Sequence, residues 1–355
     1  MKVQINKNVL EHILINCQNF IDKKDASSIT SHILIISQDN TFKVKATDYE
    51  IGIYMQTTNY KPIQDGKASA NGKKILDMIK ALKDDDIMLE TMDNELIINQ
   101  ADTEYKLDMF DTDEYPSFPE IENKSKFEIE PLDFLQSIKK ISPAIDTNNP
   151  KYELNGALID LKQNKVNFVG TDTKRLAIVS IDKDIKDDIS LIIPKKAISE
   201  MQKLFFDEMK IFYDENIMIV QSENFIFWTK LINGKYPDYQ RIIPTQTKYQ
   251  LVINKDKMIE HLRRISIVSP QMQITFSNDS INFESLNDDG GKGKTKIDFI
   301  CNLPESISLN INSKYVLDFL ANIDESEFTL EYNDSTMPFL LTSKNFKTII
   351  MPIIR

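Results

Sequence analysis

The chain has 355 residues, 41% of them hydrophobic, which is long for one core and sufficient for three small ones. No apolar run reaches the roughly 18 residues that span a membrane, and the start, Met1 to Ile5, alternates like a strand and lacks a signal-peptide core. A net charge of −11 argues against a uniform nucleic-acid surface, and two cysteines in apolar contexts, Cys17 and Cys301, indicate a reduced, cytoplasmic protein.

In chain order, the pattern of apolar residues predicts helices and short alternating strands. The predicted helices cover residues 7–21, 72–83, 131–144, 194–206, 255–267 and 313–323. Short strands with period-two alternation fill the intervals and end in polar turns. The order expected is β-α-β-β followed by β-α-β-β-β, three times over. This is an α+β fold in which two helices lie on a mostly antiparallel sheet.

The apolar faces of these helices repeat along the chain. The first helical faces are Leu10, Leu14, Cys17; Phe134, Ile138, Ile141; and Met258, Leu262, Ile265. The second are Ile75, Ile79, Leu82; Ala197, Met201, Leu204; and Val316, Leu320, Ile323. A strand-turn-strand pattern with Thr47-Asp48 likewise returns at Thr171-Asp172, and a period of about 120 residues has the size of whole domains. We therefore expect three homologous domains, at 1–120, 126–245 and 246–355.

The sequence lacks the residue combinations that the common catalytic sites require. The three histidines have no second ligand at metal spacing and no C-x-x-C is present, so no metal site is expected. The loop 290–295 contains Gly-Lys-Thr-like elements but not the spacing of a phosphate loop, and a hairpin is the better interpretation. We expect no catalytic residue and no cofactor.

Basic residues gather on the predicted helices although the protein is acidic. They are Lys73, Lys74, Lys80, Lys139, Lys140, Lys195, Lys196, Lys203, Arg263, Arg264 and Lys314. The same helices also hold acidic residues, so mixed charge on solvated helix faces is the simpler interpretation.

A second group consists of apolar residues that stand beside turns or at the C-terminus. They are Leu154, Leu176, Pro237, Ile242, Met351 and Pro352. Arg175 and Arg241 stand next to them in sequence and are expected at the rim of such a surface. The residues alone fit domain packing as well as a binding pocket.

Four motifs resemble those of the bacterial β sliding clamp family, the processivity subunit of DNA polymerase III. They are Leu154-Asn155-Gly156, Thr171-Asp172-Thr173-Lys174-Arg175-Leu176-Ala177, the run from Gly234-Lys235-Tyr236-Pro237 to Pro244, and Met351-Pro352. The sequence departs from the family at Thr173, where Gly is common, at Lys174, where His is frequent, and at the ending Ile353-Ile354-Arg355. The resemblance implies a head-to-tail homodimer that forms a ring, with helices facing duplex DNA in the hole.

The resemblance also implies three sets of site residues. A pocket for partner peptides would comprise Leu154, Thr171, Thr173, Lys174, Arg175, Leu176, Pro237, Arg241, Ile242, Met351 and Pro352. DNA contacts would come from Lys24, Asn148, Lys151, Tyr152, Lys196 and Lys203, and the dimer interface from Lys74, Tyr105, Leu107, Ile265 and Val268. The expected partners are double-stranded DNA, the polymerase III alpha subunit, the clamp loader delta subunit, and other clamp-motif polymerases and repair proteins.

Overall fold

The computed structural model describes residues 1–25, 27–162, 164–184, 188–204, 208–286, 291–301, 303 and 305–354. Phe206, Gly290 and Arg355, assigned from the sequence to a helix end, a loop and the terminal segment, lie outside these residues. By their internal contacts the residues form two compact units, 1–133 with 200–231, and 134–199 with 232–355. In the described part of the chain, no helix has the length and apolar composition needed to cross a membrane.

Six α-helices occur in the described residues. They are α1 (Lys7–Cys17), α2 (Gly72–Ala81), α3 (Pro131–Ile141), α4 (Lys195–Met201), α5 (Lys255–Ser266) and α6 (Ser313–Leu320). Each ends earlier than its apolar pattern predicted, because the buried positions continue into the loop beyond the last turn. Four helices begin after an asparagine whose side chain accepts a backbone N–H of the first turn, as Asn71 does from Lys74 at 3.1 Å.

Among the described residues all strand pairs are antiparallel, and the strands form four sheets, two of which have eight strands. The first eight-stranded sheet runs β10 (Ser125–Phe127), β15 (Lys210–Tyr213), β16 (Ile217–Gln221), β17 (Phe225–Lys230), β4 (Ile51–Thr57), β3 (Thr41–Thr47), β2 (His32–Gln38), β6 (Gly66–Asn71). The second runs β14 (Ile189–Pro194), β11 (Gly156–Lys162), β12 (Lys165–Thr171), β13 (Arg175–Asp182), β25 (Phe346–Ile350), β24 (Phe339–Ser343), β23 (Glu327–Tyr332), β18 (Tyr249–Asn254).

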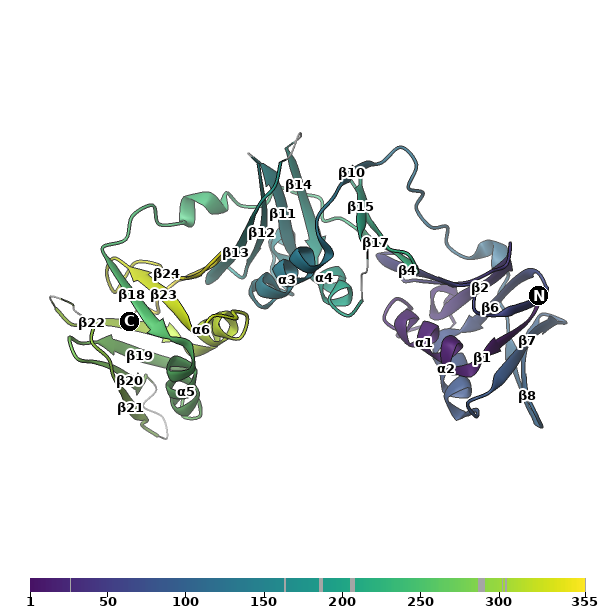
Figure 1. Cartoon of the computed structure of the whole chain (residues 1–355), viewed down its shortest axis with the longest axis horizontal. Coiled ribbons are helices and arrows are strands. Elements are labelled where there is room, and N and C mark those ends of the chain that lie inside the picture. Colours follow the sequence, from purple (N-terminus) through teal and green to yellow (C-terminus); the bar gives the residue numbers. More distant parts are fainter. Residues whose placement is uncertain are drawn as a thin grey trace. The chain divides into compact units, whose positions relative to one another are not determined.

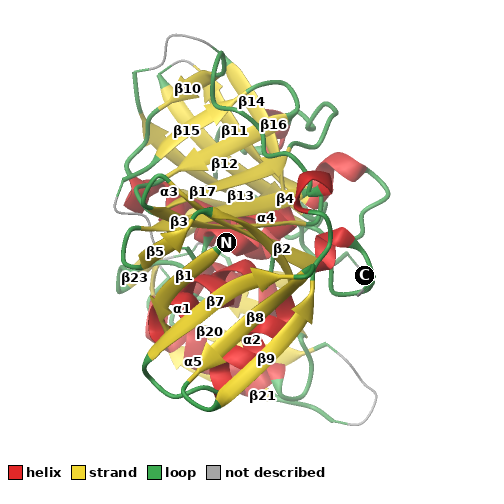
Figure 2. Cartoon of the chain, turned by 90° about the vertical axis from the view of Figure 1, so that its right-hand side faces the viewer, coloured by secondary structure: helices red, strands yellow, loops and turns green. Residues whose placement is uncertain are grey.

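The other two sheets are smaller and each belongs to a single repeat. One runs β5 (Lys61–Gln64), β1 (Lys2–Asn6), β7 (Asp86–Met92), β8 (Glu95–Gln100), β9 (Thr103–Asp108). The other runs β21 (Lys294–Asp298), β20 (Ser280–Ser285), β19 (Gln271–Phe276), β22 (Ile307–Asn312). Figure 2 shows β7, β8 and β9 side by side in the first of them. Strands β9 and β21 end their sheets, so each has one open edge among the described residues.

The predicted strand order was wrong by at least one strand in each repeat. Three strands were expected between the two helices, but the second and third repeats have four there and the first has five. The strands β6 and β22 end on the residue that caps the following helix, Asn71 or Asn312. No turn signal separates strand from helix at these points, and this is why the sequence pattern merged them.

The predicted helical faces form the cores. Every position of both sets of triplets is buried, from fully buried Leu10, Phe134 and Leu262 to Leu82 at 9% exposure. Within the first unit α1 and α2 pack side by side, and within the second unit α5 and α6 do the same (Figure 1). The 3.6-residue period therefore identified the buried side of each helix correctly.

Candidate functional site

The Thr-Asp pair that recurs in the sequence builds a tight turn between β12 and β13. The Thr171 hydroxyl donates to the carbonyl of Arg175 at 2.6 Å and accepts the N–H of Thr173 at 3.1 Å. The Asp172 carboxylate accepts the N–H groups of Lys174 and Arg175 at 3.0 and 2.9 Å. Thr173 has a φ of 71°, in the left-handed region. The turn thus satisfies its own backbone groups with two short polar side chains.

The first repeat contains the same turn between β3 and β4. Thr47 donates to the carbonyl of Ile51 at 2.8 Å and accepts the N–H of Tyr49 at 3.1 Å. Asp48 accepts the N–H groups of Glu50 and Ile51, both at 3.0 Å, and Tyr49 also has a φ of 71°. The recurring pair is therefore explained by turn geometry, and Thr171 contributes its hydroxyl to the turn itself.

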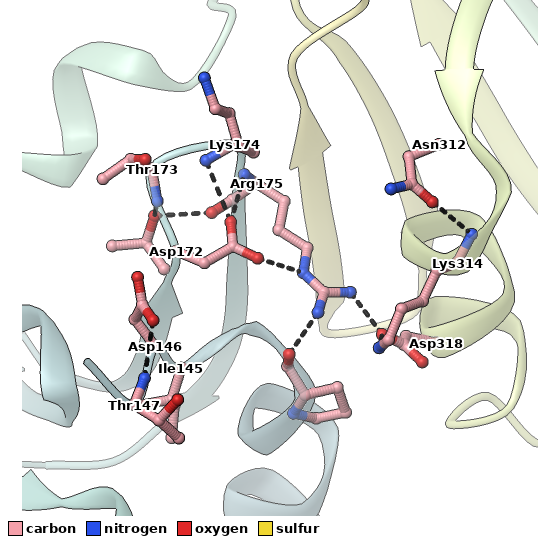
Figure 3. Close-up of polar contacts among 12 residues, drawn as sticks. Ile145, Asp146, Thr147, Asp172, Thr173, Lys174, Arg175, Asn312, Lys314 and Asp318 are labelled. Carbon is pink, nitrogen blue, oxygen red and sulfur yellow. Dashed lines mark hydrogen bonds and ion pairs between the residues drawn. The ribbon is translucent and has the colours of Figure 1, made fainter. Parts of the chain in front are cut away.

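Arg175 is the centre of a polar network that joins this turn to helix α6 (Figure 3). Its Nε lies 3.0 Å from Asp172 and its Nη1 lies 2.6 Å from Asp318. Its Nη2 donates to the carbonyl of Pro143, and the guanidinium lies 4.5 Å from the ring centroid of Tyr315. The side chain is only 4% exposed. The expectation that Arg175 forms the rim of a surface was therefore wrong, because its guanidinium is buried and pairs with Asp172 and Asp318.

An apolar cluster lies next to this turn, in the second unit. It contains Leu154, Leu158, Val169, Leu176, Ile178, Ile192, Ile232, Tyr236, Tyr239, Leu340 and Ile349, with Ile243 packed against it. Leu154 and Leu176 are buried in it, at 2% and 3% exposure. These two predicted pocket residues are therefore core residues, and little of their surface faces solvent.

The C-terminal segment runs along the Thr-Asp turn. Strand β25 pairs with β13 so that Ile350 faces Arg175, and the N–H of Met351 donates to the carbonyl of Lys174 at 2.9 Å. Met351 is 40% exposed, whereas Pro352 is buried. The sheet register therefore places two predicted residues that are far apart in sequence, Lys174 and Met351, next to each other.

The short 3₁₀ helix at Tyr239–Ile242 supplies the remaining predicted residues. Tyr239 donates from its hydroxyl to Asp160 at 2.9 Å, and burial raises the pKa of that hydroxyl. Arg241 is 85% exposed and pairs with Asp238 at 2.7 Å, and Ile242 is 45% exposed. Tyr239 thus anchors a segment on which Arg241 and Ile242 face solvent, next to half-buried Pro237.

Sequence reasoning missed a hollow beside the cluster. A pocket of about 370 Å³ is lined by Asn167, Ile178, Tyr239, Gln240, Ile243 and Lys347, among others. Ile178 and Tyr239 also belong to the apolar cluster, and Ile243 packs against it. The alternation along β13 is the signal that would have indicated Ile178, since it lies two residues from Leu176 on the same face.

The residues predicted to contact DNA are all exposed. Lys24, Asn148 and Lys151 lie in loops, and Tyr152 begins the short 3₁₀ helix Tyr152–Asn155. Lys196 lies on α4, and Lys203 lies just beyond that helix, paired with Glu200 at 2.8 Å. The loop before Tyr152 is held by reciprocal hydrogen bonds between Asn149 and Asn155 at 2.7 and 3.0 Å. The exposed loop residues are therefore presented on an ordered backbone.

The residues predicted at the dimer interface divide into exposed and buried ones. Lys74 is exposed on α2, Tyr105 is half-buried on β9, and Val268 is 42% exposed after α5. Leu107 and Ile265 are buried at 6% and 3%, so their side chains belong to their own cores. Ile267, between the predicted residues Ile265 and Val268 of the third repeat, is 87% exposed.

The titratable groups away from these surfaces are packed or hydrogen-bonded within the fold. The described residues contain no group of three or more His, Cys, Asp or Glu placed to hold a metal ion. His32 is buried and packs against Phe110 in a tilted arrangement, with ring centroids 4.4 Å apart, and His261 is hydrogen-bonded to Thr295 at 2.8 Å. Cys17 and Cys301 are free and buried, as expected from their apolar surroundings.

Comparison with known proteins covers the whole chain. Residues 1–119, 128–238 and 240–354 match models of the N-terminal, central and C-terminal domains of the DNA polymerase III beta subunit. The Helicobacter pylori beta sliding clamp is 36% identical over 99% of this chain and 100% of its own, and that of Mycoplasma capricolum is 25% identical over 99% of each. A crystal structure of the H. pylori beta clamp bound to a DNA ligase peptide superposes with a TM-score of 0.95 at 36% identity over 100% of both chains. The Pseudomonas aeruginosa subunit has the same fold, with a TM-score of 0.94 at 21% identity over 100% of both.

Proposed function

Because the chain belongs to the DNA polymerase III beta subunit family, the bacterial sliding clamps, we propose that two copies close head to tail into a ring around duplex DNA. The family is a non-catalytic processivity factor, and this chain has its three domains. We propose domain boundaries at 1–120, 126–245 and 246–355. The likeness to the H. pylori clamp over the full length of both chains is the observation that supports the assignment most strongly.

The sheet topology supports ring closure by a second copy. In the first eight-stranded sheet, β4 of the first repeat pairs with β17 of the second, and in the other, β13 of the second pairs with β25 of the third. In both cases the third strand after the first helix of one repeat pairs with the last strand of the next repeat. The equivalent pairing would join β21 of the third repeat to β9 in the first repeat of another copy. Both strands have an open edge, and Tyr105 lies on β9 while Val268 packs beside Gly293, next to β21. A heterologous contact of this kind closes a two-copy ring when the rotation fits.

Contacts to DNA would be to phosphates and independent of sequence. Exposed Lys and Arg side chains occur on all helix pairs, including Lys73 and Lys80 on α2 and Arg263 on α5. Such contacts release counterions, so the affinity falls with salt, and they contain no base readout. A ring holds DNA by topology, and weak contacts then permit sliding.

Partners would dock at the surface formed by Leu154, Leu176, Pro237, Ile242, Met351 and their neighbours. The H. pylori relative was solved with a DNA ligase peptide. For this chain we propose the polymerase III alpha subunit, the clamp loader delta subunit, and other clamp-motif polymerases and repair proteins. Two or three apolar anchors worth about 1.5–3 kcal/mol each, less ordering costs, correspond to an affinity near micromolar.

Peptide binding tests the docking surface directly. The DNA ligase peptide that was solved in complex with the H. pylori clamp is labelled with a fluorophore, titrated with protein and followed by anisotropy. Arg241→Ala and Met351→Ala should each weaken binding by about tenfold, because both side chains are exposed on the proposed docking surface. Lys235→Ala, an exposed change in the same segment, is the control and should leave the affinity unchanged. Equal affinities for all variants would reject the surface.

Retention on DNA tests the ring. Protein loaded onto nicked circular plasmid by a bacterial clamp loader should co-elute with the plasmid in gel filtration and be lost after linearisation. A protein-only scaffold would not be retained, and an enzyme acting on DNA would show magnesium-dependent cleavage or synthesis. We propose that neither occurs and that the protein works in the cytoplasm, where bacterial DNA is replicated.

A further inference from the structure

A second pocket lies in the first unit, where β4 of the first repeat pairs with β17 of the second. It has a volume of about 420 Å³ and is lined mainly by Lys45, Tyr54, Phe118, Ile121, Ile226 and Trp228. The lining comes from β3, β4, β17 and the segment that follows Tyr115-Pro116. This pocket is separate from the docking surface proposed above, and nothing in the proposed function uses it.

The two pockets occupy equivalent places in the repeat. Gly52 pairs with Trp228 across β4 and β17, and Leu176 pairs with Ile349 across β13 and β25. Gly52 and Leu176 each lie five residues after the Thr of their Thr-Asp turn, and Tyr54 and Ile178 lie two residues further. Phe118 and Tyr239 each lie three residues after the Tyr of their Tyr-Pro pair. The chain therefore builds the same hollow twice with different side chains.

The first-unit pocket has an aromatic floor in place of an aliphatic one. The indole of Trp228 lies against Gly52, where an added Cβ would be 2.3 Å from Nε1, so this glycine admits the indole. The Phe118 ring meets Trp228 edge to face, with centroids 6.0 Å apart. The ammonium of Lys45 lies 5.0 Å from the centroid of Phe118 and 5.8 Å from that of Tyr54. A cation is thus held over two rings beside an apolar floor.

Lys45 has no acidic partner among the described residues. Burial lowers its pKa, and the charges that act on it are the cations Lys43 and Lys67, which lower its pKa further. A half-buried ammonium gains from a carboxylate that shares its low-dielectric surroundings. Glu120 and Glu122, both exposed, also line the pocket, and their negative charge disfavours a polyanionic strand there.

We propose that this pocket binds a short peptide segment of a partner protein, in which a carboxylate side chain pairs with Lys45 and a neighbouring apolar side chain lies on Trp228 and Phe118. The segment would differ from ligands of the second-unit surface by needing an acidic residue. The ring would then offer a second class of docking site, distinct in sequence preference.

Trp228 provides the measurement, because it is the one tryptophan of the chain. The tripeptide N-acetyl-Asp-Leu-Phe-amide is titrated into the full-length protein while tryptophan fluorescence is followed. A saturable change is expected, and replacement of the peptide Asp by Asn should weaken binding about tenfold, the effect of losing one partly desolvated ion pair. Lys45→Met, which keeps the aliphatic stem, should weaken the Asp peptide to the level of the Asn peptide.

Two variants serve as controls. Lys230→Gln removes an equal charge from β17, where Lys230 pairs with Glu50 outside the pocket, and should leave the affinity unchanged. Arg241→Ala, which tests the proposed docking surface of the second unit, should also leave this titration unchanged, so either proposal can fail alone. No fluorescence change up to millimolar peptide, or equal affinity for the Asp and Asn peptides, would overturn the inference. Displacement of the peptide by oligothymidylate in wild type but not in Lys45→Met would overturn it in favour of a nucleic-acid site.

Discussion

Arg175 of the second repeat and Asp318 of the third form an ion pair of 2.6 Å across 143 residues of sequence. The same guanidinium holds Asp172 in the Thr-Asp turn, so the turn and helix α6 are connected through one buried side chain. Met351 takes its position from the same turn, through its hydrogen bond to Lys174. The shape of the proposed docking surface therefore depends on a residue that has almost no exposed area.

Replacement of Arg175 by Met should lower the free energy of unfolding of this part of the protein by about 3 kcal/mol, because two carboxylates lose a buried partner. Denaturant unfolding followed by circular dichroism measures the loss. Lys314→Met is the matched control, since Lys314 is exposed and pairs with the same Asp318 at 2.6 Å. That change should cost less than about 1 kcal/mol. Similar losses of unfolding free energy for the two variants would contradict the conclusion that the buried Arg175 connects the turn to α6.

Thr173 has a left-handed backbone that β-branched residues avoid, with a φ of 71°. Thr173→Gly should therefore raise the free energy of unfolding by about 1 kcal/mol, since glycine adopts this conformation without steric cost. Lys174→Gly, at the next exposed position, should instead lower it, because only the unfolded chain gains freedom there. Thermal unfolding of both variants gives the comparison, and a fall in stability for Thr173→Gly would show that its side chain stabilises the turn.

Local patterns in the sequence were sufficient for the helices, the Thr-Asp turn and the fold class. The apolar positions of α1, such as Leu10 and Leu14, and the polar pair Thr171-Asp172 act through neighbours a few residues away. Their structural roles follow from helical periodicity and turn chemistry. The buried Tyr115 and Tyr236 of the two Tyr-Pro pairs likewise repeat at matching positions.

Long-range pairing was beyond those patterns. Two contacts depend on which sheet edges meet: the pairing of β4 with β17 and the ion pair of Arg175 with Asp318. Strand alternation contains no information on that choice. Arginine is seldom buried without a partner, and the partner of Arg175, Asp318, is far away in sequence. This is why Arg175 was expected at a rim. The 87% exposure of Ile267 was also beyond the pattern, because helical periodicity does not determine the burial of an apolar residue that follows the last turn.

His32 should make stability depend on pH in the mildly acidic range. Burial, reinforced by the positive charge of Lys74, lowers the pKa of His32 to about 4. Below an ordinary pKa of about 6.5 the unfolded chain binds a proton that the folded protein does not, so the free energy of unfolding falls as pH drops from 6.5 to 4. The full effect is on the order of 3 kcal/mol.

Denaturant titrations of wild type and His32→Gln between pH 7 and 4 measure this contribution. The variant should lose less stability over that interval, whereas His12→Gln, a change at an exposed position of α1, should follow the wild type. Parallel curves for His32→Gln and wild type would exclude His32 as the source of the pH dependence.

Ile267 provides a test of ring closure that leaves the monomer intact. Its side chain is 87% exposed, so Ile267→Glu removes no core contact. If the end of α5 lies against a second copy, the new charge must be buried on association, and the dissociation constant should rise at least about tenfold. Light scattering across protein concentration distinguishes one chain of 41.0 kDa from a pair. Val252→Glu, at a position on β18 that is 55% exposed, should leave the pair intact. A variant at Ile267 that stays paired as firmly as wild type would place the interface away from α5.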